Sequence, residues 1–181
     1  MSCFIDVKKC FDTIDHDILL KKLKLYGIRE SAHLWFSDYL NNRKQYVSAN
    51  GYTSKTMNIS TGVPQGSALG PFLFLIFIND MPQHVNDASC NMFADDNSIY
   101  STGVSVIEME KRFQKSINDA NSWYQNNRLP VNIVKTLFMI SGSTRKLTDL
   151  NNSNINPKIV FNGETLNRVE KCMYLGLTLE C

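Results

Sequence analysis

The sequence has few cysteines, and their arrangement excludes the usual cysteine-based sites. Five cysteines occur in 181 residues, an odd number, without Cys-X-X-Cys spacing or neighbouring histidines. This arrangement supports neither a zinc site nor a disulfide framework. Free thiols are typical of a reducing compartment inside the cell. The cysteines are Cys3, Cys10, Cys90, Cys172 and Cys181.

Long hydrophobic runs and a strong excess of one charge are also lacking. No stretch reaches the roughly 18 apolar residues of a membrane span, and no signal peptide is visible. We therefore expect no membrane partner. The formal net charge is only +2, which argues weakly for an anionic partner. Basic clusters such as Arg43-Lys44 could neutralise phosphates, but clusters of this kind are more often solvated surface.

The composition and hydrophobic patterning are those of one globular domain, without an internal repeat or a dividing linker. Periodicity predicts helices at about 17–26, 31–41, 68–79 and 105–126. The third is apolar on almost every side, as a buried helix would be, and the fourth carries one apolar stripe at Phe113, Ile117, Ala120 and Tyr124. Strands are expected at 3–7, 45–48, 52–53, 90–93, 97–100, 137–140 and 173–179, and a mobile loop at 141–156. Asn50-Gly51 is the strongest hairpin signal. Helices interleaved with hairpin-joined strands favour an α+β fold with an antiparallel or mixed sheet.

Two acidic clusters follow predicted strands. Asp6 ends the first strand, and Asp95-Asp96 occupies a tight turn. Taken singly, such residues are more often helix caps or solvated turns. Adjacent carboxylates repel one another unless a cation or strong donors are present, and Mg²⁺ prefers hard oxygen ligands. Two such ions about 4 Å apart can stabilise the attacking and leaving oxygens of a phosphoryl displacement.

Four segments resemble the conserved motifs of reverse transcriptases. Residues 4–12 (FIDVKKCFD) look like motif A, and residues 62–71 (GVPQGSALGP) look like motif B. Phe93-Ala94-Asp95-Asp96 resembles motif C, with Phe where many members have Tyr. Residues 129–136 and 174–176 resemble motif D and the strand after it in the LINE-type branch. The motifs stand in the family's order, so the chain resembles the jockey-like enzymes of non-LTR retrotransposons.

The resemblance implies roles for the acidic residues. Asp6 and Asp95 would be the principal ligands of two Mg²⁺ ions, which Mn²⁺ could replace. Asp96 would support the site, and the carbonyl of Val7 could add an oxygen. Lys135 would neutralise the triphosphate or protonate the leaving pyrophosphate, although an exposed lysine is an equal alternative.

Further residues would bind the nucleotide or template. Phe11 would exclude the ribose 2′-hydroxyl, although without the motif it would be read as core. Gly62, Pro64 and Gly66 belong to a loop whose backbone would approach nucleic acid, because glycine permits positive φ and close contact. Gln65 would position template or nucleotide by hydrogen bonding.

The implied architecture is the palm of a right-hand polymerase with part of the fingers over residues 1–181. The N-terminal fingers, the thumb and an endonuclease domain would belong to a longer polyprotein in the cytoplasm and nucleus of the host cell. RNA template, DNA primer and deoxynucleotides would be its partners. Catalysis of this kind depends on positioning, so we expect the chain alone not to polymerise.

Other interpretations stay open. An RNA-templated RNA polymerase usually has Gly before the paired aspartates and no bulky residue at the place of Phe11. A group II intron or retron reverse transcriptase is closer, but the motif A and motif D residues favour the LINE-type branch. A catalytically inactive relic that only binds nucleic acid or protein is a third reading. Pro130, inside motif D, puts the strand pairing there in doubt.

Overall fold

The structure, a computed structural model, describes residues 1–153 and 155–181. Within them the chain forms two compact units, each assembled from separate segments. The sheet unit comprises Met1–Lys8, Asp80–Asn126 and Pro130–Cys181, and the helical unit comprises Lys9–Asn79 and Asn127–Leu129. Because the segments of the two units alternate along the chain, no single linker in the sequence separates them.

The sheet unit is built on β1 (Ser2–Ile5), the central strand of a five-stranded sheet with the order β11-β8-β1-β7-β6. Strands β7 (Asp96–Tyr100) and β8 (Leu137–Met139) flank β1 and run antiparallel to it. At the edges, β6 (Ser89–Phe93) is antiparallel to β7, and β11 (Asn167–Arg168) is parallel to β8. The α+β prediction is confirmed, with one parallel pair in the sheet.

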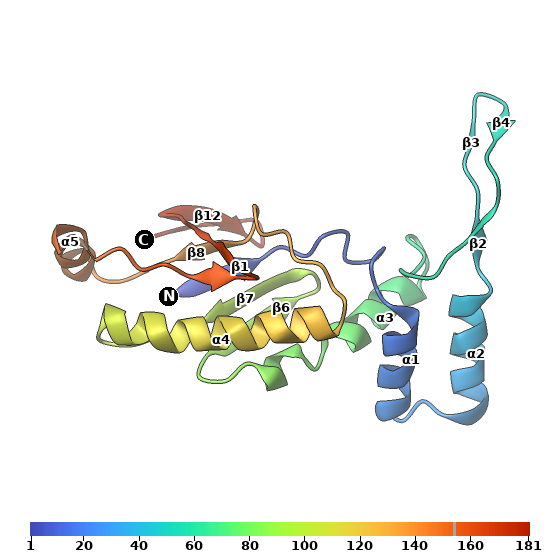
Figure 1. Cartoon of the computed structure of the whole chain (residues 1–181), viewed down its shortest axis with the longest axis horizontal. Coiled ribbons are helices and arrows are strands. Elements are labelled where there is room, and N and C mark those ends of the chain that lie inside the picture. The colour runs from blue at the N-terminus through green and yellow to red at the C-terminus, as the bar shows by residue number, and fades with distance from the viewer. Residues whose placement is uncertain (154) are drawn as a thin grey trace. The chain divides into compact units, whose positions relative to one another are not determined.

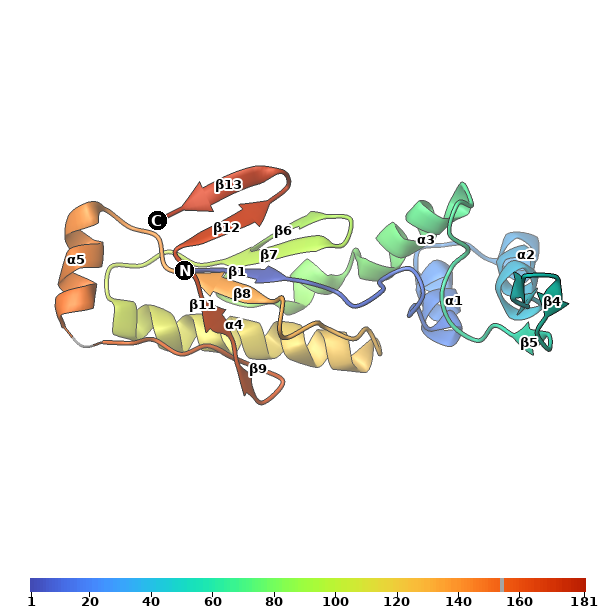
Figure 2. The ribbon, with the colours of Figure 1, turned by 90° about the horizontal axis from the view of Figure 1, so that it is seen from above.

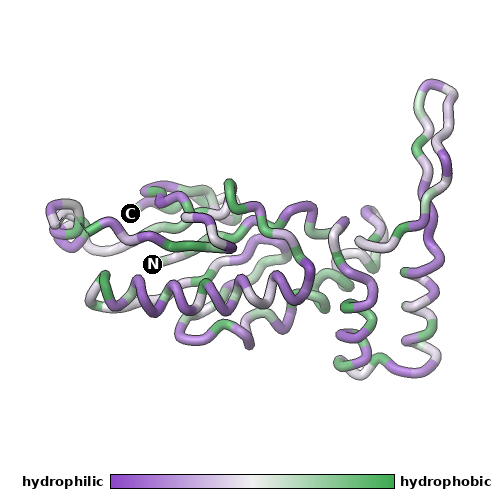
Figure 3. Tube along the Cα trace, viewed as in Figure 1, coloured by the Kyte–Doolittle hydropathy of each residue, from purple (hydrophilic) through white to green (hydrophobic). Residues whose placement is uncertain are grey.

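Helix α4 (Val106–Asn126) runs along one face of this sheet (Figure 1, Figure 2). Hydrophobic and hydrophilic positions alternate along it with helical period (Figure 3). Its predicted apolar stripe, which includes Phe113 and Tyr124, is buried. Cys3 and Ile5, which share one face of β1, are buried as well. Each large apolar side chain buried here contributes roughly 1.5–3 kcal/mol.

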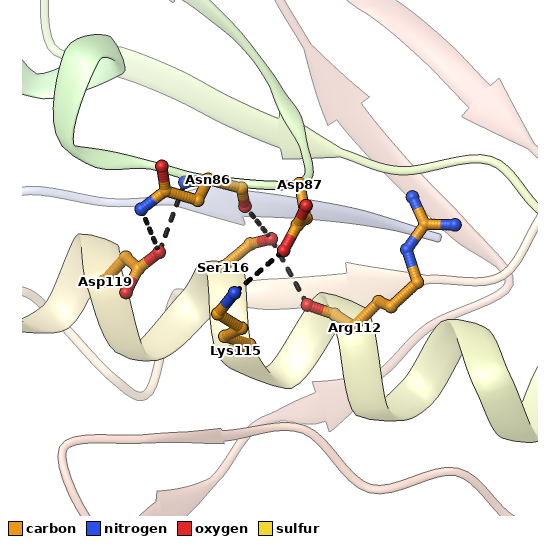
Figure 4. A network of polar contacts seen from close by, with 6 residues as sticks. All are labelled: Asn86, Asp87, Arg112, Lys115, Ser116 and Asp119. Atoms are coloured by element: carbon orange, nitrogen blue, oxygen red, sulfur yellow. Dashed lines mark hydrogen bonds and ion pairs between the residues drawn. The ribbon is translucent and has the colours of Figure 1, made fainter.

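The segment that leads into β6 is tied to α4 by polar contacts (Figure 4). It follows the 3₁₀ helix η1 (Met81–His84). The backbone and side-chain amides of Asn86 both donate to Asp119, at 3.2 and 3.0 Å. Lys115 pairs with Asp87 at 3.0 Å, and the Ser116 hydroxyl donates to a backbone carbonyl in the same segment. These contacts fix where β6 begins.

A mobile loop at 141–156 is a wrong prediction for most of that range. Helix α5 (Thr144–Asn152) forms there, while Asn154 lies outside the described residues. Ser143 caps the helix by accepting from the backbone of Lys146, and Leu150 is buried. The cap and the buried leucine outweigh the polar composition that suggested a loop.

The expected single strand at 173–179 is also wrong. It is a hairpin of β12 (Lys171–Tyr174) and β13 (Leu177–Glu180). Leu175 and Gly176 form its turn with φ of 49° and 75°, as a two-residue type I′ turn requires. A second hairpin, of β9 (Val160–Phe161) and β10 (Glu164–Thr165), was not predicted.

Three of the four predicted helices form the helical unit, α1 (His16–Leu25), α2 (Glu30–Asn41) and α3 (Leu69–Ile78). Lys22 of α1 is buried and donates to the carbonyl of Phe77 in α3 at 2.7 Å. Burial of α3 on almost every side is a wrong prediction, since its side chains Phe72 and Leu75 are about half exposed, at 46% and 50%. No helix within 1–153 and 155–181 combines the length and apolar character needed to cross a membrane.

The chain from α2 to α3 passes through a long hairpin. It contains two separate ladders, β2 with β5 and β3 with β4. The hairpin predicted from Asn50-Gly51 is confirmed, and the φ values of 50° and 77° fit a type I′ turn. The four strands are β2 (Lys44–Gln45), β3 (Ser48–Ala49), β4 (Tyr52–Thr53) and β5 (Met57–Asn58).

Candidate active site

Asp6 stands one residue beyond β1, and its backbone is held on both sides. Its N–H donates to Oγ1 of Thr136 at 3.2 Å, and its carbonyl accepts from the N–H of Asn132 at 2.8 Å. Thr136 is fully buried, and its hydroxyl also donates to the carbonyl of Asn132. The motif D segment therefore fixes the position from which the half-buried Asp6 side chain projects.

Pro130 does not disrupt this pairing. A proline cannot donate through its nitrogen, but its carbonyl accepts from the N–H of Lys8 at 2.8 Å. Val7 and Val131 then form an antiparallel bridge. The pairing that the sequence put in doubt is present, because only the carbonyl of the proline is used.

The turn that joins β6 to β7 is Ala94-Asp95, so the prediction that Asp96 also lies in the turn is wrong: Asp96 pairs with Phe93 as the first residue of β7. Ala94 adopts a φ of 53° in this turn, and Asn97 steadies it by donating to the carbonyl of Asp95 at 3.1 Å. Ile5 pairs with Asn97 across the antiparallel ladder, so the next position places Asp6 opposite Asp96. The sheet thus brings together the two acidic clusters that are about 90 residues apart in the sequence.

The assembled carboxylates affect one another. The pKa of Asp96 is raised above its ordinary value, first by partial desolvation and then by the negative charges of Asp95 and Asp6. The Asp96 side chain remains exposed, so solvent screens much of this repulsion. A cation placed here would relieve it.

The donor set suits Mg²⁺ chemically, because it consists of carboxylate oxygens at the end of a sheet. No three Asp, Glu, His or Cys side chains are already gathered as a metal site anywhere in the described part of the chain. Mg²⁺ commonly uses only one or two protein carboxylates, with water and substrate phosphates as the other ligands. The assignment of Asp6 and Asp95 as the protein ligands of such a site stays a prediction.

Two further motif residues are Tyr174 and Lys135. The hydroxyl of Tyr174 in β12 donates to the carbonyl of Asp96 at 3.5 Å, and its ring lies 5.1 Å from that of Phe4. Lys135 lies in the turn next to Thr136, donates its N–H to Asn132 at 3.1 Å, and has an exposed side chain. Its role at the triphosphate stays a prediction. The contact of Tyr174 with Asp96 could not be predicted, because the sequence shows only that residues 174–176 resemble a motif.

The helical unit holds the predicted nucleotide-binding residues. The half-buried ring of Phe11 packs against Phe74 of α3, with 5.0 Å between ring centroids. The N–H of Val63 donates to the carbonyl of Phe11 at 2.7 Å, and that of Gly62 donates to Ile14 at 2.7 Å. Motifs A and B are therefore joined through their backbones, and the exclusion of ribose by Phe11 stays a prediction.

Gly62 has a structural reason to be glycine. Its φ is +85°, and a Cβ there would lie 2.7 Å from the carbonyl oxygen of Asp12. Gly66, at φ +79°, has open space around it. The close approach at Gly62 is thus to this chain's own backbone, whereas Gly66 leaves room beside the loop. Gln65 donates to Asp12 at 2.9 Å, and the carbonyl of Pro64 accepts from the backbone after it.

The predicted site residues are divided between the two units. The sheet unit holds Asp6, Val7, Asp95, Asp96 and Lys135. The helical unit holds Phe11, Gly62, Pro64, Gln65 and Gly66.

Sequence comparison agrees with the motifs. The family described as reverse transcriptase (RNA-dependent DNA polymerase) matches residues 1–179. The RNA-directed DNA polymerase from mobile element jockey of Drosophila melanogaster is 28% identical over 187 residues, covering 99% of this chain and 19% of that protein. The probable RNA-directed DNA polymerase from transposon BS of the same species is 30% identical over 190 residues, covering 98% and 20%. The chain spans about a fifth of the length of these curated relatives.

Structural comparison supports the fold. Apo telomerase from Candida tropicalis, truncated from its C-terminal domain, superimposes with a TM-score of 0.66 at 15% identity. The match covers 99% of this chain and 34% of that chain. At this identity the likeness concerns the fold alone. The family match over residues 1–179 does more than this, because it shows that the chain belongs to the reverse transcriptase (RNA-dependent DNA polymerase) family.

Proposed function

We propose that this chain is the catalytic core of an RNA-directed DNA polymerase from a non-LTR retrotransposon. Its reaction would be two-metal transfer of a deoxynucleotide to a primer 3′-hydroxyl, with release of pyrophosphate. The observation that supports this most is the antiparallel register that sets Asp6 opposite Asp96 at the end of the sheet. Two acidic strand ends meeting in this way are what the chemistry needs.

The chain's part in this reaction is to hold and orient. Asp6 and Asp95 would bind the ions, with Asp96 and the carbonyl of Val7 in support. When bound, the ions would supply charge neutralisation at the attacking and leaving oxygens. The hydrogen bonds from Asp6 to Thr136 and from Asn132 to Asp6 keep the first ligand in place. Such positioning is the main contribution of a protein to phosphoryl transfer.

The remaining roles concern recognition. Phe11 would exclude ribonucleotides, and Lys135 would offset negative charge on the triphosphate. Gln65 and the loop of Gly62, Pro64 and Gly66 would contact nucleotide or template. RNA template, DNA primer and deoxynucleotides are thus the proposed partners.

The relatives are about five times as long as this chain, so we propose that it acts within a longer protein. That protein would add fingers, thumb and endonuclease parts and would work in the cytoplasm and nucleus of the host cell. Catalysis of this kind depends on holding primer end, template and nucleotide together, so we expect no extension from residues 1–181 alone.

The test is primer extension by the longer protein on matched RNA and DNA templates, with Asp95→Asn and an exposed control on α5, Asp149→Asn. The proposal expects RNA-templated DNA synthesis that is lost in Asp95→Asn and kept in Asp149→Asn. Template binding should survive in both variants, because the substitution changes one carboxylate and leaves the binding surface intact. Template binding without any extension by the unaltered protein would instead identify an inactive relic.

A further inference from the structure

The hairpin between α2 and α3 is positively charged and lacks acidic residues. The hairpin surface comprises residues 43–58, and no Asp or Glu occurs anywhere between Asp38 and Asp80. Arg43, Lys44 and Lys55 lie within it. No ion pair neutralises the two lysines among the described residues. A local excess of three positive charges in a chain of net charge +2 is suited to an anionic partner.

This surface also presents aromatic rings to solvent. Every residue in its four strands is exposed, and the side chains of Tyr46 and Tyr52 are 62% and 83% exposed. In the helical unit the hairpin projects beyond the end of α2 (Figure 1). Hydrophobic and hydrophilic positions are mixed along it (Figure 3). Exposed rings between cations are the usual elements of a single-strand binding surface.

The base of the hairpin is ordered by a stack of side chains at the end of α2. Trp35 and Tyr39 share one face of α2 at four-residue spacing, and Arg43, two residues beyond the helix, continues the stack. The rings of Trp35 and Tyr39 are 5.4 Å apart at 10°, and the guanidinium of Arg43 lies 5.4 Å from the Tyr39 ring centre. The hydroxyl of Tyr39 is 2.7 Å from that of Ser67. Arg43 is therefore held in place by its neighbours, which lowers the entropy cost of binding.

A pocket of about 670 Å³ adjoins this base, entirely within the helical unit. Lys9, Arg43 and Lys44 line it together with polar residues. Asp12 is the one acidic residue among its lining residues, and it already accepts a hydrogen bond from Gln65. Amide and hydroxyl groups in the lining suit both phosphate oxygens and sugar hydroxyls.

We propose that the hairpin surface and this pocket bind single-stranded RNA without strong sequence preference. Arg43, Lys44 and Lys55 contact phosphates, while Tyr46 and Tyr52 stack on bases. The choice of RNA rests on the proposed function, in which RNA is the template. The binding itself follows from charge and exposed rings and needs neither metal nor catalysis.

The test is fluorescence anisotropy with the 181-residue chain and a labelled 12-residue oligouridine RNA, in chelator and without nucleotides. A catalytically inactive polymerase would still bind RNA in this assay. Failure of the RNA-binding proposal is therefore distinguishable from failure of the proposed function. Replacing Arg43, Lys44 and Lys55 by Gln should weaken binding and reduce the slope of log affinity against log salt by about 2, since each phosphate contact contributes about 0.7. The matched control changes three exposed lysines of the sheet unit, Lys111→Gln, Lys146→Gln and Lys158→Gln, and should leave the affinity within about twofold.

The stacking is tested separately from the charge. Tyr46→Ala with Tyr52→Ala should weaken binding about tenfold or more, whereas Tyr46→Phe with Tyr52→Phe keeps both rings and should retain affinity. Unchanged affinity in the Gln and Ala variants would overturn the proposal. Stronger binding of a matched oligodeoxynucleotide would overturn the assignment to RNA. If the Ala variant abolishes self-association of the chain but not RNA binding, the hairpin is a protein contact and the proposal is wrong.

Discussion

The backbone N–H of Asp6 donates to the side-chain hydroxyl of Thr136, 3.2 Å away and 130 residues later in the sequence. This bond connects the first proposed metal ligand to the motif D segment. Because Thr136 is fully buried, water cannot easily take the place of its hydroxyl as the partner of the Asp6 N–H. The position of Asp6 therefore depends on a residue outside the acidic clusters.

Thr136→Val keeps the shape of the side chain and removes the acceptor. We expect a loss of about 1 kcal/mol in stability, because the part-buried N–H of Asp6 loses its partner. Extension by the longer protein should fall as well, with binding of the template unchanged. Chemical denaturation and primer extension measure the two effects. Thr136→Ser is the control, since it keeps the hydroxyl; equal behaviour of Val and Ser would show that the bond does not position Asp6.

This contact also shows where sequence reasoning ends. The hairpin around Asp95-Asp96 and the strand before Asp6 could be predicted, because alternation and turn residues are local signals. The bond between Asp6 and Thr136 could not, because it depends on which strands become neighbours. The resemblance to motif D marked Thr136 without saying what it does.

Local polar composition was a poorer guide elsewhere. Residues 141–156 were expected to form a loop because Ser, Asn and Thr dominate them, yet a capping Ser143 and a buried Leu150 suffice for α5. The approach of Gly62 to nucleic acid stays a prediction, but the structure gives a second reason for the glycine, since its backbone lies close to Asp12. A glycine in a sequence indicates an unusual backbone or a close approach, but it does not say to what.

Gly62→Ala should destabilise the chain more than Gly66→Ala. Both glycines have positive φ, which costs alanine roughly 1–2 kcal/mol at either position. Only at position 62 does the new Cβ also meet backbone, 2.7 Å from the Asp12 carbonyl. The difference in unfolding free energy between the two variants isolates that clash. Similar losses in both would indicate that the loop moves away freely.

Asp96→Asn should stabilise the metal-free chain at neutral pH. Its pKa is raised in the fold, so the folded chain binds the proton more tightly than the unfolded chain does. Protonation of Asp96 therefore stabilises the fold, and this contribution is fully present at pH values below the ordinary pKa of a carboxyl group. It is lost as the pH rises through the raised pKa of Asp96. Since the side chain is exposed, the gain should stay below about 1 kcal/mol, or at most about 2–4 °C in Tm.

Thermal melts in acid and at neutral pH test this sign. The gain of Asp96→Asn should disappear in acid, and added Mg²⁺ should stabilise the wild type more than the variant. Asp149→Asn on α5 is the control. A gain that is larger in acid would contradict the proposed repulsion among Asp6, Asp95 and Asp96.

Phe11→Ala should raise ribonucleotide incorporation relative to deoxynucleotide incorporation by the longer protein. The reason is steric, because a ring removed from beside the sugar leaves room for a 2′-hydroxyl. Phe11→Tyr keeps the ring and should keep the discrimination. The ratio of kcat/KM for matched ribo- and deoxynucleotides is the measurement. If the ratio is the same in the Ala variant, the contact with Phe74 is the whole role of Phe11.

The most direct measurement is single-turnover primer extension by the longer protein with Asp6→Asn, Asp95→Asn and the double variant. If the two carboxylates act as one unit, each single variant should lose at least about a thousandfold in rate, and the double variant should lose little more. Circular dichroism and template binding confirm that each variant remains folded. Losses that multiply in the double variant, or a single variant that keeps near-normal rate, would contradict a shared site at Asp6 and Asp95.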